Sequence, residues 1–205
     1  MKRHEGVNVH LSGARRRAGF DERETPRDSQ LLERIIARDL QAFEQLYRHY
    51  QPRLSRFLIN IVNRPQVVEE VLDDTMMAVW NTAANFRGAS KVSTWIFAIA
   101  YRQAVKARSR WDEPLPDLQD NDQASPDAQP DELLQNSRSH DALVEAMAQL
   151  SSDHRAVVDL TYFHGLGYRE IADIMGCPID TVKTRMFHAR RKLKRVIAGD
   201  AADWL

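Results

Sequence analysis

Apolar side chains recur every three or four residues through most of the chain, which is the spacing of one buried face on an α-helix. Over residues 31–61 the pattern predicts packed helices, with a break or kink between two of them at Pro52, because proline has no backbone N–H to donate. A further apolar face follows Pro65, and another runs through residues 94–110. No stretch alternates apolar and polar residues as a strand does. The pattern therefore predicts an all-α protein.

Two stretches lack this periodicity. Residues 1–28 mix charge, Gly and Pro, and they predict a disordered arm. Its Arg15–Arg17 cluster could contact a phosphate backbone, but we interpret it as part of a solvated tail. Residues 112–138 predict a flexible acidic linker, since they open with DEPLPDLQDNDQASPDAQPDE, a run without a basic residue and with little to bury. The chain is thus expected to form two helical domains, over residues 29–111 and 139–199.

Composition narrows the class of protein. The 205 residues are 43% hydrophobic, which is enough for real cores, and the zero net charge hides an acidic linker and a basic carboxy-terminal region. Cys177 is the single cysteine, so an internal disulfide and a cysteine-cluster zinc site are excluded. The amino terminus lacks the apolar core of a signal peptide, and no apolar run is long enough to cross a bilayer. We expect a soluble, cytoplasmic protein.

The run YREIADIMGCPIDTVKTRMFHARRKLKR predicts a helix-turn-helix. Gly176 supplies a position of positive φ that ends the first helix, and Pro178 prevents that helix from continuing. Asp180 or Thr181 can cap the second helix. The apolar residues of this second helix fall three or four apart, on one stripe: Val182, Met186, Ala189 and Leu193.

The remaining face of the second helix is basic and carries no acid beyond Asp180. A solvated helix in an ordinary bundle would explain the charge alone, but the whole layout favours a helix that enters a DNA major groove. Phe187 could contact DNA or belong to the core, and His188 has no second metal ligand at a suitable spacing. The candidate DNA contacts are Thr181, Lys183, Thr184, Arg185, Phe187, His188, Arg190 and Arg191.

The run YFHGLGYREIADIMGCPIDTVKTRMFHARRKLK resembles the carboxy-terminal promoter-binding domain of bacterial extracytoplasmic-function (ECF) sigma factors. The segments AFEQLYRHYQPRLSRFL, EEVLDDTMMAVW and FRGASKVSTWIFAIAYRQA are similar to the amino-terminal half of the same family, in the same order. The resemblance covers residues 31–197. It implies a sigma factor that joins core RNA polymerase, directs it to a class of promoters and helps to open the DNA. The helix-turn-helix domain would recognise the minus-thirty-five element of these promoters.

The resemblance also implies where the polymerase binds. The family's acidic helix docks on the clamp coiled coil of the largest subunit, and the matching residues are Glu69, Glu70, Asp73 and Asp74. The second domain would meet the flap of the second-largest subunit. A merely solvated acidic face is one alternative. A carboxylate metal site in a helical bundle is another, but its Glu-x-x-His pattern is absent, and we expect no metal and no cofactor.

In the family, the loop and helix that match residues 86–110 recognise and melt the minus-ten element. Trp95 could stack on a base or lie in the core. Arg102 stands where members commonly carry Asn and Lys106 where they often carry Asp, which alters the expected base preference and strengthens phosphate attraction. Asp180 likewise replaces a Gly. The candidates are Arg87, Ser90, Lys91, Thr94, Arg102, Lys106, Arg108 and Arg110.

The family further implies an anti-sigma factor as a partner, which would cover both DNA-binding surfaces and could hold the protein at a membrane. No catalytic motif is present, so we expect no enzyme. Two other classes stay open on the residues alone. One is a helix-turn-helix repressor or activator that works without polymerase, and the other is a helical hydrolase with a carboxylate site.

Overall fold

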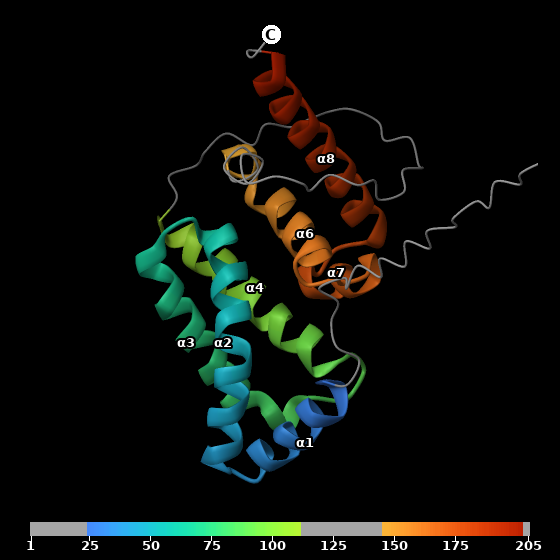
Figure 1. The fold of residues 1–205 in the computed structure, drawn as a ribbon. Helices are drawn as coiled ribbons and strands as arrows, with labels where there is room; N and C mark the ends of the chain where they lie inside the picture. The colour runs from blue at the N-terminus through green and yellow to red at the C-terminus, as the bar shows by residue number, and fades with distance from the viewer. Residues whose placement is uncertain (1–23, 112–144, 203–205) are drawn as a thin grey trace, which may run out of the picture.

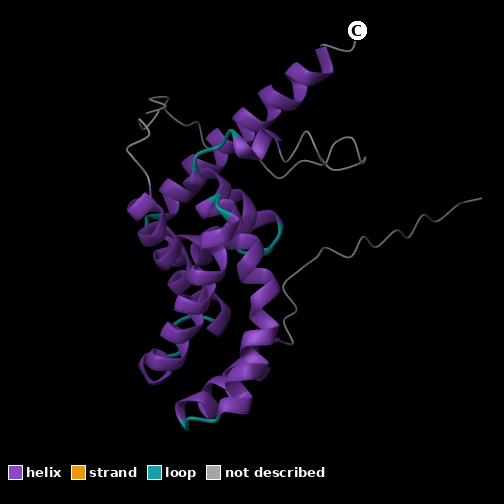
Figure 2. Ribbon diagram, turned by 90° about the vertical axis from the view of Figure 1, so that its left-hand side faces the viewer, coloured by secondary structure: helices purple, strands orange, loops and turns teal. Residues whose placement is uncertain are grey.

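The computed structural model describes residues 24–111 and 145–202, and the side chains of residues 27–110 and 145–196. Within these ranges every regular element is a helix, as Figure 2 shows. The predicted all-α fold is therefore confirmed. The predicted acidic linker over 112–138 and most of the predicted arm lie outside the described residues.

The first domain contains four α-helices and a short 3-10 turn: α1 (Glu24–Ile36), α2 (Leu40–Val62), α3 (Pro65–Thr82), η1 (Ala83–Asn85) and α4 (Val92–Trp111). Helices α2, α3 and α4 contact one another pairwise, and α1 closes one end against α2 and α4 (Figure 1). The fully buried side chains that form the centre of this domain come mainly from α2 and α4, and they include Leu46, Tyr50, Leu54, Phe57, Ile96 and Phe97.

Two predictions in this domain were wrong at their boundaries. Residues 24–28 belong to α1 rather than to the arm, and buried Asp28 accepts a 2.5 Å hydrogen bond from the Tyr50 hydroxyl. That partner lies on another helix, so the local pattern could not indicate it. Pro52 lies inside α2, not between two helices. The packing of fully buried Tyr50 and Leu54 on either side of it outweighs the cost of one missing backbone hydrogen bond.

The break between the first two helices lies earlier in the chain than Pro52, between Ile36 and Leu40. Helix α1 ends before Arg38, which has a φ of 63°, and Asp39 then caps α2 by accepting a 3.1 Å hydrogen bond from the backbone N–H of Ala42. The Arg34 guanidinium and this N–H lower the pKa of the Asp39 carboxyl. Helix α2 ends at Asn63, whose φ of 55° lies in the left-handed region that Asn tolerates.

The second domain contains α6 (Ser152–Tyr162), α7 (Tyr168–Met175) and α8 (Ile179–Ala202), after a helical turn over residues 145–148. Gly176 ends α7 with a φ of 64°, as predicted. The predicted stripe on α8 is confirmed, because Val182, Met186 and Ala189 are buried. Helix α8 begins at Ile179, before both residues expected to cap it: Asp180 and Thr181 lie in its first turn, where an acidic side chain still favours the helix dipole.

The two domains pack against each other. Helix α2 contacts α6, and α4 contacts α7, so α8 lies on the far side of the second domain from the first (Figure 1). Among the described residues no helix is long and apolar enough to cross a membrane.

Candidate polymerase and DNA interfaces

The acidic face predicted for residues 69–74 lies on α3. All four of its carboxylates are exposed, since the apolar side of α3 faces α2 and α4. The Tyr47 hydroxyl of α2 donates a 2.9 Å hydrogen bond to Asp73, and partial burial, together with that carboxylate, raises the pKa of Tyr47. The structure thus brings Glu69, Glu70, Asp73 and Asp74 together on one surface.

Apolar groups continue this acidic face along α3. Met77 is 52% exposed, and half-buried Trp80 packs edge-on against Phe43 with ring centroids 5.1 Å apart. Arg38, the residue of positive φ before α2, lies 5.3 Å from the Trp80 ring. Acidic groups beside exposed apolar ones suit a protein partner that is basic and partly apolar.

A basic stripe runs along the exposed side of α4. Arg102, Lys106 and Arg110 are spaced by four residues and are all exposed, so they follow one face of the helix. Arg110 also lies 3.9 Å from Glu70 on α3, where the basic stripe meets the acidic face. Arg87 is exposed in the loop before α4, and Ser90 is half-buried there.

Three of the residues predicted to contact the minus-ten element are buried or lie against the second domain. Thr94 is only 2% exposed, because it faces the core on the first turn of α4. The prediction that its side chain contacts DNA is therefore wrong. Arg108 is half-buried and lies near Arg155 of α6. Burial lowers the pKa of Arg155, and the like charge of Arg108 lowers it further. The Lys91 ammonium pairs with Glu170 of α7 at 3.1 Å.

Trp95 is half-buried, and its ring lies 5.3 Å from that of Phe86. Both rings pack against the core of the first domain. Of the two interpretations that the sequence left open, packing is thus the one that the structure supports for most of this side chain.

The predicted recognition helix is α8, and its candidates divide by what they contact. Arg185 forms an ion pair with Asp153 of α6 at 2.5 Å, and Arg190 donates a 3.1 Å hydrogen bond to the hydroxyl of Tyr162, also on α6. These two cations flank the buried stripe and help to fix α8 on α6. Lys183 is exposed and pairs with Asp180 one turn before it.

The other candidates lie farther from the buried stripe. Arg191 is exposed, and Thr181, Thr184, Phe187 and His188 are half-buried. The Phe187 ring lies 5.5 Å from that of His188, and His188 lies 6.3 Å from His154 of α6. Since Thr184, Phe187 and Arg191 fall opposite Val182 on the helix, they form the outward face of α8.

Sequence reasoning missed the residues between the domains. Asp153 and Asp159 of α6 accept hydrogen bonds from Tyr101 and Asn60 of the first domain, the latter across 99 positions of sequence. The His164 ring packs against that of Phe97 on α4. A buried Asp five residues before a buried His carries no local pattern that would have indicated this contact. Among the described residues, no three His, Cys, Asp or Glu side chains gather as a metal site would require.

Comparisons with known proteins identify the family of this chain. A family model for sigma-70 region 2 matches residues 46–112, and one for sigma-70 region 4 matches residues 140–193. The ECF RNA polymerase sigma factor RpoE of Cereibacter sphaeroides is 31% identical over 162 residues, which cover 77% of this chain and 87% of that protein. The RNA polymerase sigma-H factor of Pseudomonas aeruginosa is 29% identical over 180 residues, covering 83% and 93%. The chain belongs to the ECF family of RNA polymerase sigma factors.

Two solved structures share the fold. CnrH in complex with the cytosolic domain of CnrY has a TM-score of 0.62 at 21% identity, covering 84% of this chain and 98% of that one. The sigma factor RpoE in complex with the anti-sigma factor NepR from Bartonella quintana has a TM-score of 0.56 at 26% identity, covering 76% and 96%.

Proposed function

We propose that this ECF sigma factor docks on core RNA polymerase through the acidic face of α3, receives the minus-ten element on α4 and reads the minus-thirty-five element with α8. As a sigma factor it directs the initiation of transcription at particular promoters. The observation that carries the residue assignment is the separation of charge: acidic side chains are exposed on α3, while basic ones are exposed on α4 and α8.

The polymerase contact rests on the acidic face of α3. A basic coiled coil, such as the clamp of the largest subunit, would be attracted and oriented by its four exposed carboxylates. Tyr47 holds Asp73 in place, and exposed Met77 offers apolar area beside the charges. The second domain would add a contact with the flap of the second-largest subunit.

The minus-ten contact rests on the basic stripe of α4. Cations spaced along one helix can follow the phosphates of a strand that has left the duplex, while neighbouring side chains hold its bases. Arg102, Lys106 and Arg110 supply such a row, and Arg87 and Lys91 extend it into the preceding loop. Arg108 and Ser90 would act beside them.

The minus-thirty-five contact rests on the outward face of α8. In a helix-turn-helix, side chains early in the second helix reach base edges in the major groove. Lys183, Thr184 and Phe187 hold those positions, and Arg191 lies one turn later, where phosphate contacts fix the register. Thr181, Arg185, His188 and Arg190 flank this face.

The protein carries out no reaction of its own in this proposal, because the polymerase supplies catalysis. It acts in the bacterial cytoplasm, where polymerase meets the chromosome. An anti-sigma factor is proposed as its regulator. Support comes from the fold shared with a sigma factor whose solved structure holds the anti-sigma factor NepR.

The polymerase contact can be tested by reversing charge on α3. Asp73→Arg/Asp74→Arg is expected to weaken binding to core polymerase by about 30-fold or more, because placing like charges together costs several kcal/mol. Glu33→Arg/Glu44→Arg makes the same change in net charge at exposed positions of α1 and α2 and serves as the control. Binding is measured by titration of labelled protein with core enzyme. Equal loss in both variants would contradict the assignment.

A further inference from the structure

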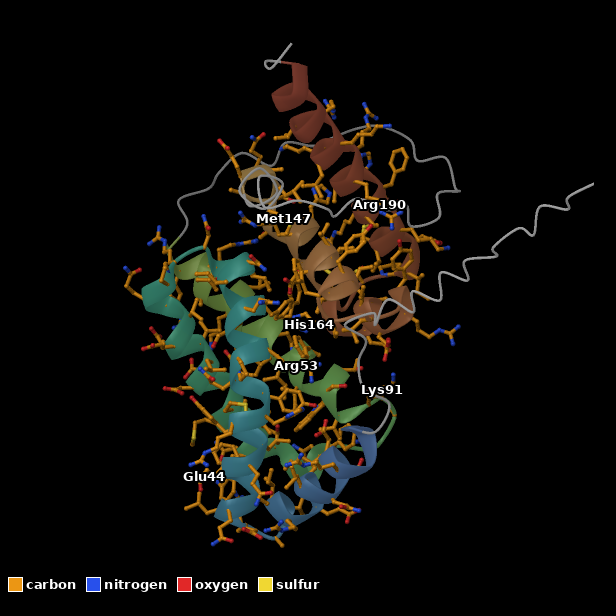
Figure 3. The ribbon with its side chains drawn as sticks, viewed as in Figure 1. Glu44, Arg53, Lys91, Met147, His164 and Arg190 are labelled. Carbon is orange, nitrogen blue, oxygen red and sulfur yellow. The ribbon has the colours of Figure 1, made fainter. Side chains whose placement is uncertain are left out.

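Two arginines of α8 lie at the edges of its buried stripe, and each has a partner on α6. The Arg185 guanidinium pairs with the Asp153 carboxylate. Nε of Arg190 donates a 3.1 Å hydrogen bond to the Tyr162 hydroxyl, and the Arg190 guanidinium lies 5.8 Å from the centroid of the Tyr162 ring. Figure 3 shows Arg190 on the part of α8 that lies beside α6. The two arginines therefore differ in the kind of partner that holds them.

The charge of the partner decides what each arginine still attracts. The Asp153 carboxylate compensates the positive charge of Arg185, whose side chain is only 26% exposed. Tyr162 offers a hydroxyl oxygen and the face of its ring, and neither carries a net charge. Arg190 thus keeps its full positive charge while its guanidinium is held in one orientation. An anion outside the protein is attracted more strongly to Arg190 than to Arg185.

Arg190 also lies on the side of α8 that continues the proposed reading face. It comes seven residues after exposed Lys183, which is about two helical turns, so the two cations follow one row along the helix. Arg185 instead lies three residues after buried Val182 and four residues before buried Ala189, next to the packed side. A DNA duplex that contacts Lys183 would therefore pass close to Arg190.

Tyr162 brings a second helix to this row. It is the last residue of α6 and is 42% exposed, so its contact with Arg190 lies at the surface. An arginine side chain loses rotamer entropy when a ligand fixes it. Here the hydroxyl and the ring hold the guanidinium before a ligand arrives, which reduces that loss on binding. Because the hydroxyl engages Nε, a phosphate would be bound through the two terminal nitrogens, which can donate to it together.

We propose that Tyr162 is a positioning residue of the DNA interface: it holds the Arg190 guanidinium in place for a phosphate of the minus-thirty-five duplex, although it lies outside the helix-turn-helix. The inference rests on the proposed function, because it concerns the duplex that α8 reads. It adds a residue of α6 to that interface, and it separates Arg190 from Arg185, which fixes α8 on α6. Such a backbone contact sets the register of a recognition helix without reading sequence.

A double-mutant cycle tests this role. The affinity of the full-length protein for a duplex that carries the upstream motif of its promoters is measured by anisotropy at several salt concentrations. Arg190→Ala should weaken binding about tenfold and reduce the slope of log affinity against log salt by about 1. Tyr162→Phe, which removes only the hydroxyl, should weaken binding about threefold. In the Arg190→Ala background Tyr162→Phe should have no further effect, because no guanidinium is left to hold.

Two further variants separate positioning from a general effect on the second domain. Phe163→Ala removes the neighbouring ring, which is also 42% exposed but lies against Arg56 of α2, and it should leave the salt slope unchanged. Tyr162→Ala should weaken binding at least as much as Tyr162→Phe does. Arg185→Ala should reduce the salt slope by less than Arg190→Ala does, because Asp153 already compensates the charge of Arg185.

Two results would overturn the proposal: wild-type affinity of both Tyr162 variants, or a loss on Tyr162→Phe that is as large in the Arg190→Ala background as in the wild type. The second result would mean that the hydroxyl acts on folding or on DNA without Arg190. Failure of the proposed function looks different. In that case the wild type does not prefer this duplex over an unrelated duplex of the same length, and this inference falls with it.

Discussion

Helices α4 and α8 both carry a row of basic side chains, yet they are built in different ways. On α4 the apolar side chains occupy most of the circumference, because the helix packs against α2, α3 and α7, and its cations emerge through one remaining strip. On α8 one apolar stripe contacts α6 and α7, and most other side chains are polar, with Phe187 an exception on the outward face. The basic row on α4 therefore lies on a helix that is mostly buried in the core of its domain, while the basic row on α8 lies on a helix with a single buried stripe.

The largest difference between the two helices should appear in stability. Phe97→Ala empties a fully buried position of α4 beside Phe57, and it is expected to lower the free energy of unfolding by about 3–5 kcal/mol. Phe187→Ala removes a half-buried ring from the outward face of α8 and should cost less than about 1 kcal/mol. Thermal unfolding of the two variants measures both effects. Similar losses would contradict the contrast between the helices.

Promoter opening should depend more on α4 than on α8. Arg102→Ala/Lys106→Ala removes two exposed cations that would hold the melted strand, and we expect about tenfold less open complex at an unchanged amount of bound polymerase. Chemical probing of unpaired thymines measures the opening. Arg48→Ala, an exposed cation on α2, is the control. If the variant loses duplex binding but not promoter opening, the assignment of the α4 stripe to the melted strand is wrong.

Duplex binding should depend more on α8. Lys183→Ala and Arg191→Ala are each expected to reduce the slope of log affinity against log salt by about 1, because each removes a cation that lies against the DNA and the counterion release that comes with it. Affinity for a minus-thirty-five duplex is measured by anisotropy at several salt concentrations. If Arg102→Ala changes this slope as much as either variant, the division of labour between α4 and α8 is wrong.

The smallest expected effect concerns the turn between α7 and α8, which sets the orientation of α8. Gly176 has a φ of 64°, and a Cβ there would meet no atom within 4 Å, so Gly176→Ala introduces backbone strain without a clash. The expected loss is about 1 kcal/mol in the free energy of unfolding, and Gly176→Asn should lose less, because Asn tolerates the left-handed region. Thermal unfolding distinguishes them. A larger loss for Asn than for Ala would contradict this account of the turn.

The same contrast explains what could be predicted from the sequence. The helix-turn-helix was predictable because its signals are local: the glycine that ends α7, the stripe of α8 and its basic face lie within about thirty residues. The first domain was recognised by its resemblance to a family, and the exposure of its acidic face on α3 followed from helical spacing alone.

What could not be predicted depended on contacts between distant helices. Thr94 carries no mark that separates a buried threonine from an exposed one, and Pro52 is tolerated in α2 because packing on both sides outweighs a local preference. Asn60, Asp159 and His164 are polar residues whose environment is created only when the two domains meet.

The central claim is that one chain reads two promoter elements for RNA polymerase, and run-off transcription on a genomic fragment library tests it most directly. Wild type with core polymerase should start transcripts downstream of one shared bipartite motif. Lys183→Ala/His188→Ala should lose the dependence on the upstream half, and Arg102→Ala/Lys106→Ala should lose initiation at the downstream half. If the protein binds duplex DNA while transcription by core polymerase never depends on it, the account is contradicted and the chain acts as an ordinary helix-turn-helix regulator.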